Sequence, residues 1–302
     1  MVIQRPSARS KRNDRLLTLR DYVRLIKPRI IPLLVLVALA SAIIADRSIP
    51  PALTLVGLLA AGTLASAGAL ATNSYLEIDV DSMMKRTKGR PLPTEQIPKN
   101  HALAFAVSLL ALGVVVAFLT LNIYATFFIA LGALVYIEIY TIWLKPRTTW
   151  NIVLGGFAGS CAVLAGWYAI TLSDPATAWV LAALVFVWTP SHFWSLAVIT
   201  ESDYAAAGIP MLPSVVGKER AAQFIVTNTL LLIPISLLFY FYLSGGGALV
   251  YLLGAVAFDA GLLATNIKLL RAPTKSNAFL AFKFSSPYLA VIFVLACVAA
   301  LL

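Results

Sequence analysis

Long apolar stretches, each bounded by charged residues, Pro or Gly, recur nine times along this chain of 302 residues. A helix that crosses a membrane needs about 20 mostly apolar residues, and these stretches approach that length. Because 60% of the residues are apolar and only 12% are charged, an ordinary soluble domain and a disordered chain are both excluded. We therefore predict an all-α membrane protein, a bundle of nine transmembrane helices without strands. The predicted spans are 30–45, 52–72, 101–120, 123–143, 151–171, 176–199, 223–243, 246–267 and 279–301.

The first predicted span is short, because Arg29 and Asp46 bound it closely. We expect its helix to extend backward through the amphipathic segment 22–29, with a kink near Pro28 or Pro32, since proline interrupts helical hydrogen bonding. The chain then divides into a basic N-terminal arm, residues 1–28, and one transmembrane domain, residues 29–302.

Positive charge falls almost entirely on one side of this arrangement. All 23 Lys and Arg residues except Arg47 lie in the N-terminal arm or in alternate connections, while the links between them are short and nearly neutral. The positive-inside rule places the basic side in the cytoplasm, so the N-terminus is predicted inside and the C-terminus outside a cell membrane. An Arg-rich arm leaves the mitochondrial inner membrane as the alternative. The net charge of +10 therefore indicates topology and not a nucleic-acid partner.

Acidic residues cluster at the cytoplasmic end of the second span. If the helix continues, Asn73, Glu77 and Asp81 recur every four residues and share one face. Asp79 lies about 120 degrees off that face. It remains a candidate ligand that would join through water or a bent helix end. Carboxylates at a membrane boundary are unfavourable unless they bind a cation or form ion pairs.

Two arginines, Arg86 and Arg90, follow these acids directly. Carboxylate and amide oxygens suit Mg²⁺, which takes few protein ligands and completes its shell with water and substrate phosphate oxygens. Arginine presents a planar fork that fits phosphate. The competing interpretation is a solvated loop whose acids and bases pair with each other. The complete pattern favours a site for Mg²⁺ and a diphosphate.

This string resembles the first Asp-rich motif of the UbiA-type intramembrane prenyltransferases, Asn-x3-Asp-x3-Asp followed by Arg-x3-Arg. The resemblance implies a bundle of nine transmembrane helices in which Asn73, Glu77 and Asp81 hold Mg²⁺ on the diphosphate of an isoprenoid donor. Glu77 departs from the usual Asp, which keeps an oxygen ligand on a longer side chain and alters the expected metal geometry.

Two further segments are predicted on the same side, where they would surround one cytoplasm-facing active-site cavity. The linker 140–151 contains Lys145, Arg147 and Asn151, and the run 188–213 contains Trp-Thr-Pro-Ser-His-Phe-Trp and Gly-Ile-Pro-Met-Leu-Pro. Both segments resemble the haem-farnesylating branch of the family. Other members carry a second Asp-rich motif where this chain has His192, Phe193, Glu201 and Asp203, so the ligands of a second Mg²⁺ stay open.

The resemblance implies roles for individual residues. Lys145 and Arg147 are expected to join Arg86 and Arg90 on the diphosphate. His192 is expected to act in acceptor binding, iron ligation or proton transfer, against the alternative of an interior histidine satisfied by a neighbour. Candidate acceptor or cavity residues are His192, Trp194, Tyr75, Asn151, Asp203 and Tyr204.

The reaction that the resemblance implies is farnesyl transfer from farnesyl diphosphate to a vinyl group of haem b, followed by water addition, giving haem O and diphosphate. Expected partners are both substrates, the lipid bilayer, and a haem A synthase or terminal oxidase assembly. One alternative is a prenyltransferase for an aromatic or lipid acceptor. A second is a multispan transporter, which is disfavoured because the acids cluster at one face and do not trace a path across the spans.

Overall fold

The computed structural model describes residues 18–302, and all regular structure in that range is helical. Five basic residues of the predicted N-terminal arm lie outside the described range: Arg5, Arg9, Lys11, Arg12 and Arg15. The helices are α1 (Leu19–Leu25), α2 (Ile31–Asp46), α3 (Ala52–Leu76), α4 (Ile78–Met83), α5 (Lys99–Thr120), α6 (Ile123–Leu134), η1 (Val135–Leu144), α7 (Asn151–Gly155), α8 (Phe157–Tyr168), α9 (Pro175–Ile199), α10 (Glu201–Ala206), α11 (Leu212–Leu238), η2 (Phe239–Tyr242), α12 (Gly246–Arg271) and α13 (Lys275–Leu301).

Eight helical segments among the described residues are long and apolar enough to cross a membrane. Some of these segments consist of two consecutive helices; α6 and η1 form one such segment, and α7 and α8 form another. They coincide with eight of the nine predicted spans. The ninth corresponds to α2, an apolar helix of 16 residues that is shorter than the other spans.

The prediction for the segment before α2 was wrong in one respect. Residues 22–29 do not extend α2 backward, because α1 is a separate helix that ends at Leu25. Lys27, between the two helices, has a φ of 49°, a left-handed conformation that cannot continue a right-handed helix. The chain therefore turns at Lys27, and Pro32 lies within the first turn of α2, where proline is tolerated.

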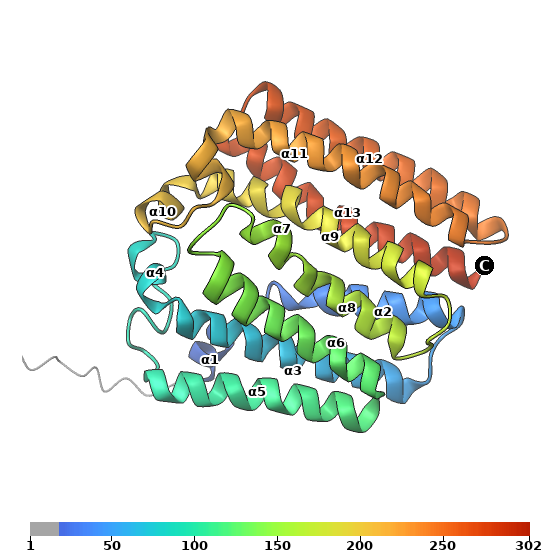
Figure 1. Cartoon of the computed structure of the whole chain (residues 1–302), viewed down its shortest axis with the longest axis horizontal. Coiled ribbons are helices and arrows are strands. Elements are labelled where there is room, and N and C mark those ends of the chain that lie inside the picture. Colours follow the sequence, from blue (N-terminus) through green and yellow to red (C-terminus); the bar gives the residue numbers. More distant parts are fainter. Residues whose placement is uncertain (1–17) are drawn as a thin grey trace, which may run out of the picture.

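The long helices run side by side along one common direction (Figure 1). Small residues let their backbones approach closely, as is typical of helices that pack within membranes. A Cβ atom added at Gly68 of α3 would lie 2.4 Å from the backbone nitrogen of Leu110 in α5. One added at Gly166 of α8 would lie 1.9 Å from the carbonyl oxygen of Ala38 in α2. These contacts fix α3 against α5 and α2 against α8.

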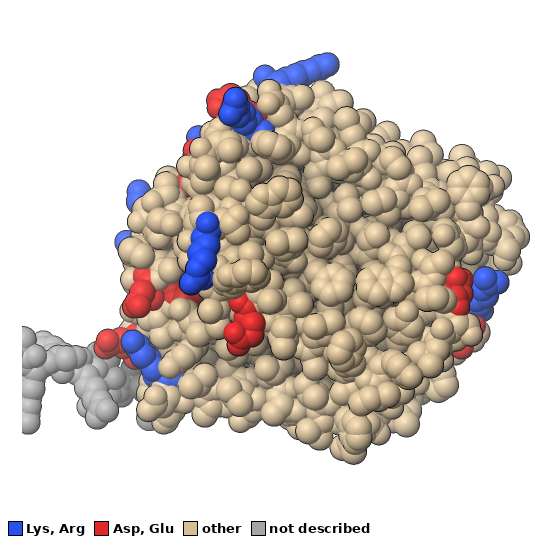
Figure 2. Space-filling view, in the orientation of Figure 1, with Lys and Arg blue, Asp and Glu red and all other residues tan. Residues whose placement is uncertain are grey.

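Short helices and connecting loops collect at one end of the bundle, where α4 and α10 lie (Figure 1). In the visible face most Lys, Arg, Asp and Glu side chains gather toward that end, and a broad uncharged band covers the middle of the bundle (Figure 2). This distribution fits the charge asymmetry expected from the sequence. The predicted site residues also lie toward this end.

Candidate active site

The three predicted ligands of the first motif share one buried face. Asn73 lies in the last turn of α3 and Asp81 lies in α4; these residues are 2% and 3% exposed, and Glu77 between the helices is 7% exposed. Although the helix breaks at Glu77, the helical spacing survives, because the amide of Glu77 donates to the Asn73 carbonyl at 3.0 Å and that of Asp81 to the Glu77 carbonyl at 2.7 Å. Asp79 is exposed, as its register predicts.

Each member of this face meets a basic side chain. Arg90 donates from one guanidinium nitrogen to both carboxylate oxygens of Asp81, at 2.9 and 2.7 Å. Lys145 donates to the Glu77 carboxylate. Lys27 donates to the amide oxygen of Asn73. We call these six residues the carboxylate cluster: Asn73, Glu77, Asp81, Lys27, Arg90 and Lys145.

The charges of the cluster are strongly coupled. Burial alone would raise the pKa of Glu77, but the attraction of Lys145 and Lys27 outweighs burial and holds that pKa below its usual value. Burial alone would lower the pKa of Lys145, but Glu77 holds it above its usual value. Burial, together with the positive charge of Arg90, lowers the pKa of Lys27 to about 7. The cluster therefore contains more basic groups than its two carboxylates can neutralise.

Lys27 is a site residue that the sequence analysis did not single out. It was counted only as one of many basic residues in the N-terminal arm. Its left-handed backbone turns the chain between α1 and α2 and brings its ammonium to Asn73. Non-glycine residues held in this conformation gather at functional sites. The available signal was the basic triplet Lys27-Pro28-Arg29 directly before an apolar span.

An unusual helix places Lys145. Residues Val135–Leu144 form the π-helix η1, and the amide of Lys145 donates to the Tyr140 carbonyl five residues earlier, at 2.8 Å. Such wide turns are frequent at functional sites. The Lys145 ammonium lies 5.7 Å from the centroid of the Tyr140 ring. The Thr141 hydroxyl, from the same helix, accepts a hydrogen bond from the side-chain amide of Asn73 at 3.0 Å.

The remaining predicted diphosphate ligands lie at the edge of the cluster. The Arg86 side chain is exposed, whereas its backbone amide donates to Asp203 at 3.1 Å, and the amide of Lys85 donates to the same carboxylate at 3.2 Å. Asp203 thus anchors the loop that carries Arg86. The Arg147 guanidinium donates to the carbonyls of Ile142 and Trp143, both at 2.8 Å, so it caps η1 outside the cluster.

His192 lies in α9 between two aromatic rings. It stacks on Trp188 with ring centroids 4.4 Å apart and on Phe282 of α13 at 4.6 Å. Its Nδ1 is buried without a hydrogen-bond partner in the described structure. Buried polar atoms normally find a partner, so this nitrogen is suited to a ligand.

The other predicted acceptor residues divide into two groups. Trp194 and Tyr204 pack in one apolar cluster with Tyr140, and the indole nitrogen of Trp194 and the side-chain oxygen of Asn151 are also buried without a partner in the described structure. Tyr75 instead packs with Leu25 between α1, α3 and α5. The structure therefore gathers Trp194 and Tyr204 near Tyr140 and leaves Tyr75 in an apolar cluster beside the site.

The donor set of the cluster fits Mg²⁺. Its oxygens come from two carboxylates and one amide, which are hard ligands, and Mg²⁺ uses only one or two protein carboxylates. Within residues 18–302 no group of three or more His, Cys, Asp and Glu side chains gathers in a metal-binding arrangement. A site of this kind would depend on a substrate to complete the metal shell.

Comparison of the sequence with known proteins identifies its relatives. The UbiA prenyltransferase family model matches residues 34–300. Protoheme IX farnesyltransferase 1 of Cenarchaeum symbiosum is 44% identical over 279 residues, 91% of this chain and 93% of that protein. Protoheme IX farnesyltransferase of Metallosphaera sedula is 42% identical over 274 residues, 91% of this chain and 94% of that protein.

Solved structures show the same fold. A digeranylgeranylglyceryl phosphate synthase has a TM-score of 0.75 and 20% identity, covering 94% of this chain and 98% of that chain. A UbiA homologue from Archaeoglobus fulgidus bound to GPP and Mg²⁺ has a TM-score of 0.68 and 16% identity, covering 91% and 99%. The resemblance inferred from the Asp-rich motif is confirmed: this chain belongs to the UbiA prenyltransferase family.

Proposed function

We propose that the protein transfers a farnesyl group from farnesyl diphosphate to a vinyl group of haem b, with addition of water, giving haem O and diphosphate. The observation that carries this assignment is the identity of 44% and 42% to two protoheme IX farnesyltransferases over nine tenths of the chain. The buried carboxylate cluster supports it, because it offers oxygen ligands and cations in one place.

Asn73, Glu77 and Asp81 would hold Mg²⁺, as supported by the A. fulgidus homologue solved with GPP and Mg²⁺. When bound, the metal would offset negative charge on the leaving diphosphate. Lys27, Arg86, Arg90 and Lys145 would donate to the diphosphate oxygens. Three basic groups face two carboxylates in the cluster, so an entering anion meets a surplus of positive charge. Preorganised charges of this kind favour departure of the diphosphate. Arg147 would join them if its guanidinium left the carbonyls of Ile142 and Trp143.

The acceptor side would be formed by α7, α9 and α13. Trp188, His192 and Phe282 form one stack of flat aromatic rings, and the porphyrin ring is also flat. The unpaired atoms of His192, Trp194 and Asn151 supply polar contacts. We place haem b there, with its vinyl group toward the cluster. The apolar surroundings would protect the allylic cation from water until the vinyl group attacks. Water would then capture the resulting cation.

The orientation proposed from the sequence remains part of this assignment. We propose nine crossings, with α2 as the shortest, the N-terminus in the cytoplasm and the carboxylate cluster in a cavity open to that side. Relatives from archaea favour a cell membrane over a mitochondrial one. The haem O formed would pass to a haem A synthase or terminal oxidase, the partners that the resemblance implies.

The decisive experiment supplies purified protein with haem b, farnesyl diphosphate and Mg²⁺ and analyses the products by mass spectrometry. We expect haem O and free diphosphate, and loss of both when EDTA removes the metal. A parallel reaction offers an aromatic acceptor and a lipid acceptor in place of haem b. Prenylation of one of these without haem O would refute the haem assignment, and release of no diphosphate with any acceptor would refute prenyl transfer.

A further inference from the structure

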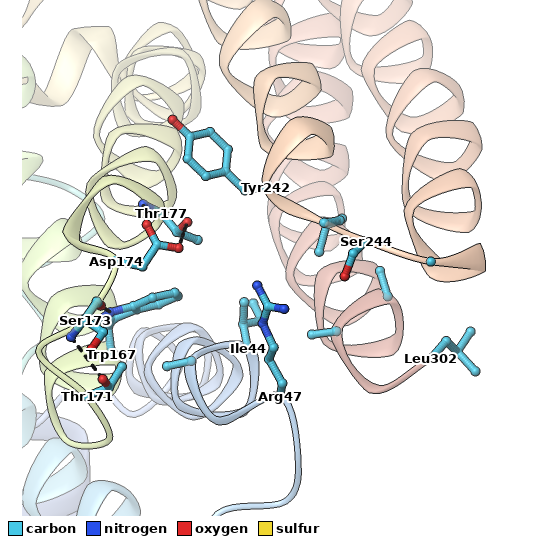
Figure 3. Close-up of a pocket in the computed structure, with 15 residues that line it drawn as sticks. Ile44, Arg47, Trp167, Thr171, Ser173, Asp174, Thr177, Tyr242, Ser244 and Leu302 are labelled. Carbon is cyan, nitrogen blue, oxygen red and sulfur yellow. Dashed lines mark hydrogen bonds between the residues drawn. The ribbon is translucent and has the colours of Figure 1, made fainter.

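A cavity of about 300 Å³ opens at the end of the bundle opposite the carboxylate cluster. Its walls come from the end of α2, the connection between α8 and α9, the turn after η2 and the last turn of α13. Ile44, Trp167, Leu243 and Ala300 give it apolar walls. Figure 3 shows Arg47 projecting into the space between Asp174 on one wall and Ser244 on the other.

Arg47 is the only Lys or Arg in the described connections at this end. It forms no hydrogen bond or ion pair with the rest of the described chain. The nearby acids already have donors, since the Asp46 carboxylate accepts from the Ser48 hydroxyl at 2.6 Å and that of Asp174 accepts from the backbone amide and hydroxyl of Thr177. The Arg47 guanidinium therefore keeps its donors available in the cavity.

The backbone of this cavity is also unusual. Within residues 18–302 four residues other than glycine have a left-handed φ, and two of them, Arg47 at 52° and Asp174 at 49°, line it. A third is Lys27, in the carboxylate cluster. Such conformations are unfavourable for side-chain-bearing residues and persist where the surrounding structure holds them, often at ligand sites. The left-handed conformation of Arg47 ends α2 and directs the Arg47 side chain toward the cavity.

Aromatic residues frame the opening. Trp167 is buried and its indole nitrogen donates to the Ser173 carbonyl at 3.2 Å, which fixes the ring. Tyr242 lies across the cavity (Figure 3). Trp and Tyr favour the level of lipid headgroups, and this cavity lies at the ends of the apolar spans. An arginine fork, hydroxyl groups and apolar walls at that level suit one ligand class, an amphiphile that carries a phosphate.

We propose that this cavity binds the phosphate headgroup of a membrane lipid, with Arg47 on the phosphate and the apolar wall of Ile44 and Leu243 along the glycerol and upper acyl chain. Free phosphate shares the charge but not the apolar body, so the walls favour the lipid. This proposal is independent of the haem assignment, because none of the residues invoked belongs to the carboxylate cluster.

The test is native mass spectrometry of the full protein, released from dodecyl maltoside, titrated with dioleoylphosphatidylglycerol. The variant Arg47→Gln removes the charge, and Ser244→Trp fills the cavity at an exposed turn without changing any charge. Arg271→Gln, an exposed arginine at the end of α12, is the matched control. Dioleoylglycerol, which lacks phosphate, and inorganic phosphate, which lacks the apolar body, are the competing probes.

We expect one tightly held phosphatidylglycerol on the wild-type protein and on Arg271→Gln. Affinity should fall about tenfold in Arg47→Gln, the usual effect of losing a charge-assisted hydrogen bond, and Ser244→Trp should weaken binding similarly. Neither dioleoylglycerol nor inorganic phosphate should displace the lipid. Unchanged binding to Arg47→Gln and Ser244→Trp would overturn the site. Displacement by inorganic phosphate alone would overturn the lipid assignment.

Discussion

Two acids only two residues apart have opposite surroundings. Glu77 is buried and ion-paired with Lys145, whereas Asp79 is exposed in the first turn of α4. Helical residues two positions apart point to opposite sides, which accounts for the difference. A buried carboxylate is retained when a cation compensates its charge, and an exposed one needs no such partner. The pair therefore provides a matched comparison of a site acid with a neighbouring acid.

We predict that Glu77→Gln lowers the rate of haem O formation by about 10²-fold or more, because it removes a charge that holds both Lys145 and the proposed Mg²⁺. Asp79→Asn should keep a rate close to that of the wild-type protein. Rates are measured at saturating farnesyl diphosphate and haem b, by mass spectrometry of the product.

Folding is controlled separately, since an unpaired buried Lys145 can destabilise the Glu77 variant. Thermal unfolding of Glu77→Gln and Asp79→Asn is followed by circular dichroism. Asp81→Asn serves as a second test of the face, because wild-type Asp81 pairs with the half-buried Arg90. A folded Glu77→Gln and a folded Asp81→Asn that both turn over at the wild-type rate would contradict the metal site. If Asp79→Asn lost as much activity as Glu77→Gln, the conclusion that Asp79 lies outside the metal-binding face would be contradicted.

Local spacing predicts this part of the site well, and remote contacts are what it misses. Asn73, Glu77 and Asp81 share a face because helical geometry acts over a few residues, even across the break at Glu77. Lys27 reaches Asn73 across 46 positions of sequence through a left-handed turn, which no short-range pattern encodes. Arg147 was expected to join the diphosphate ligands because it lies in a basic linker. Its position in that linker does not determine where its guanidinium points.

At the scale of elements, the π-helix η1 connects helix packing to the site. It presents Tyr140 toward α7, where a Cβ atom added at Gly155 would lie 2.7 Å from the Tyr140 ring. The ring therefore packs where glycine leaves room for it. The carbonyl of Tyr140 accepts the hydrogen bond of the Lys145 amide, so a displaced ring would move the lysine that pairs with Glu77.

We predict that Gly155→Ala lowers kcat by about 10²-fold, because displacement of a catalytic group by about 1 Å has an effect of that size. Alanine favours helix more than glycine does, so loss of helix propensity would not account for the defect. Gly62→Ala is the control, since its Cβ would lie 3.8 Å from Val35, an ordinary contact. Steady-state kinetics with farnesyl diphosphate measure kcat of Gly155→Ala and Gly62→Ala, and a melting curve of each variant shows whether a loss of kcat is a loss of stability. Wild-type kcat in Gly155→Ala would show that η1 tolerates the displacement.

Element boundaries at the site were harder to predict than the spans. The apolar runs locate eight long helical segments, because length and hydropathy alone define a membrane span. The division of the predicted span 123–143 into α6 and η1, and the end of α3 at Leu76, are details that length and hydropathy do not define. Hydropathy carries no information on a π-helix, so η1 was predicted only as part of a continuous span.

At the scale of the whole molecule, charge asymmetry predicts an orientation for the bundle in the membrane. The loop after α4 is basic and the turn before α12 is not, and five long apolar segments, beginning with α5 and ending with α11 and η2, separate them. An odd number of crossings puts these two connections on opposite sides of the membrane. Gly89 lies in the basic loop and Gly246 is the first residue of α12, directly after the turn, and a Cβ atom added at either would meet nothing within 4 Å. A cysteine fits both positions without disturbing the fold.

We predict that a membrane-impermeant maleimide labels Gly246→Cys in right-side-out vesicles and labels Gly89→Cys only after permeabilisation, because the positive-inside rule keeps the basic loop in the cytoplasm. The wild-type protein is the blank, since Cys161 is buried and Cys297 lies within the apolar helix α13. Leu19→Cys, at an exposed position before α2, should label with Gly89→Cys if the short helix α2 completes nine crossings. Labelling of Leu19→Cys together with Gly246→Cys would leave eight crossings, and labelling of Gly89→Cys from outside would invert the orientation.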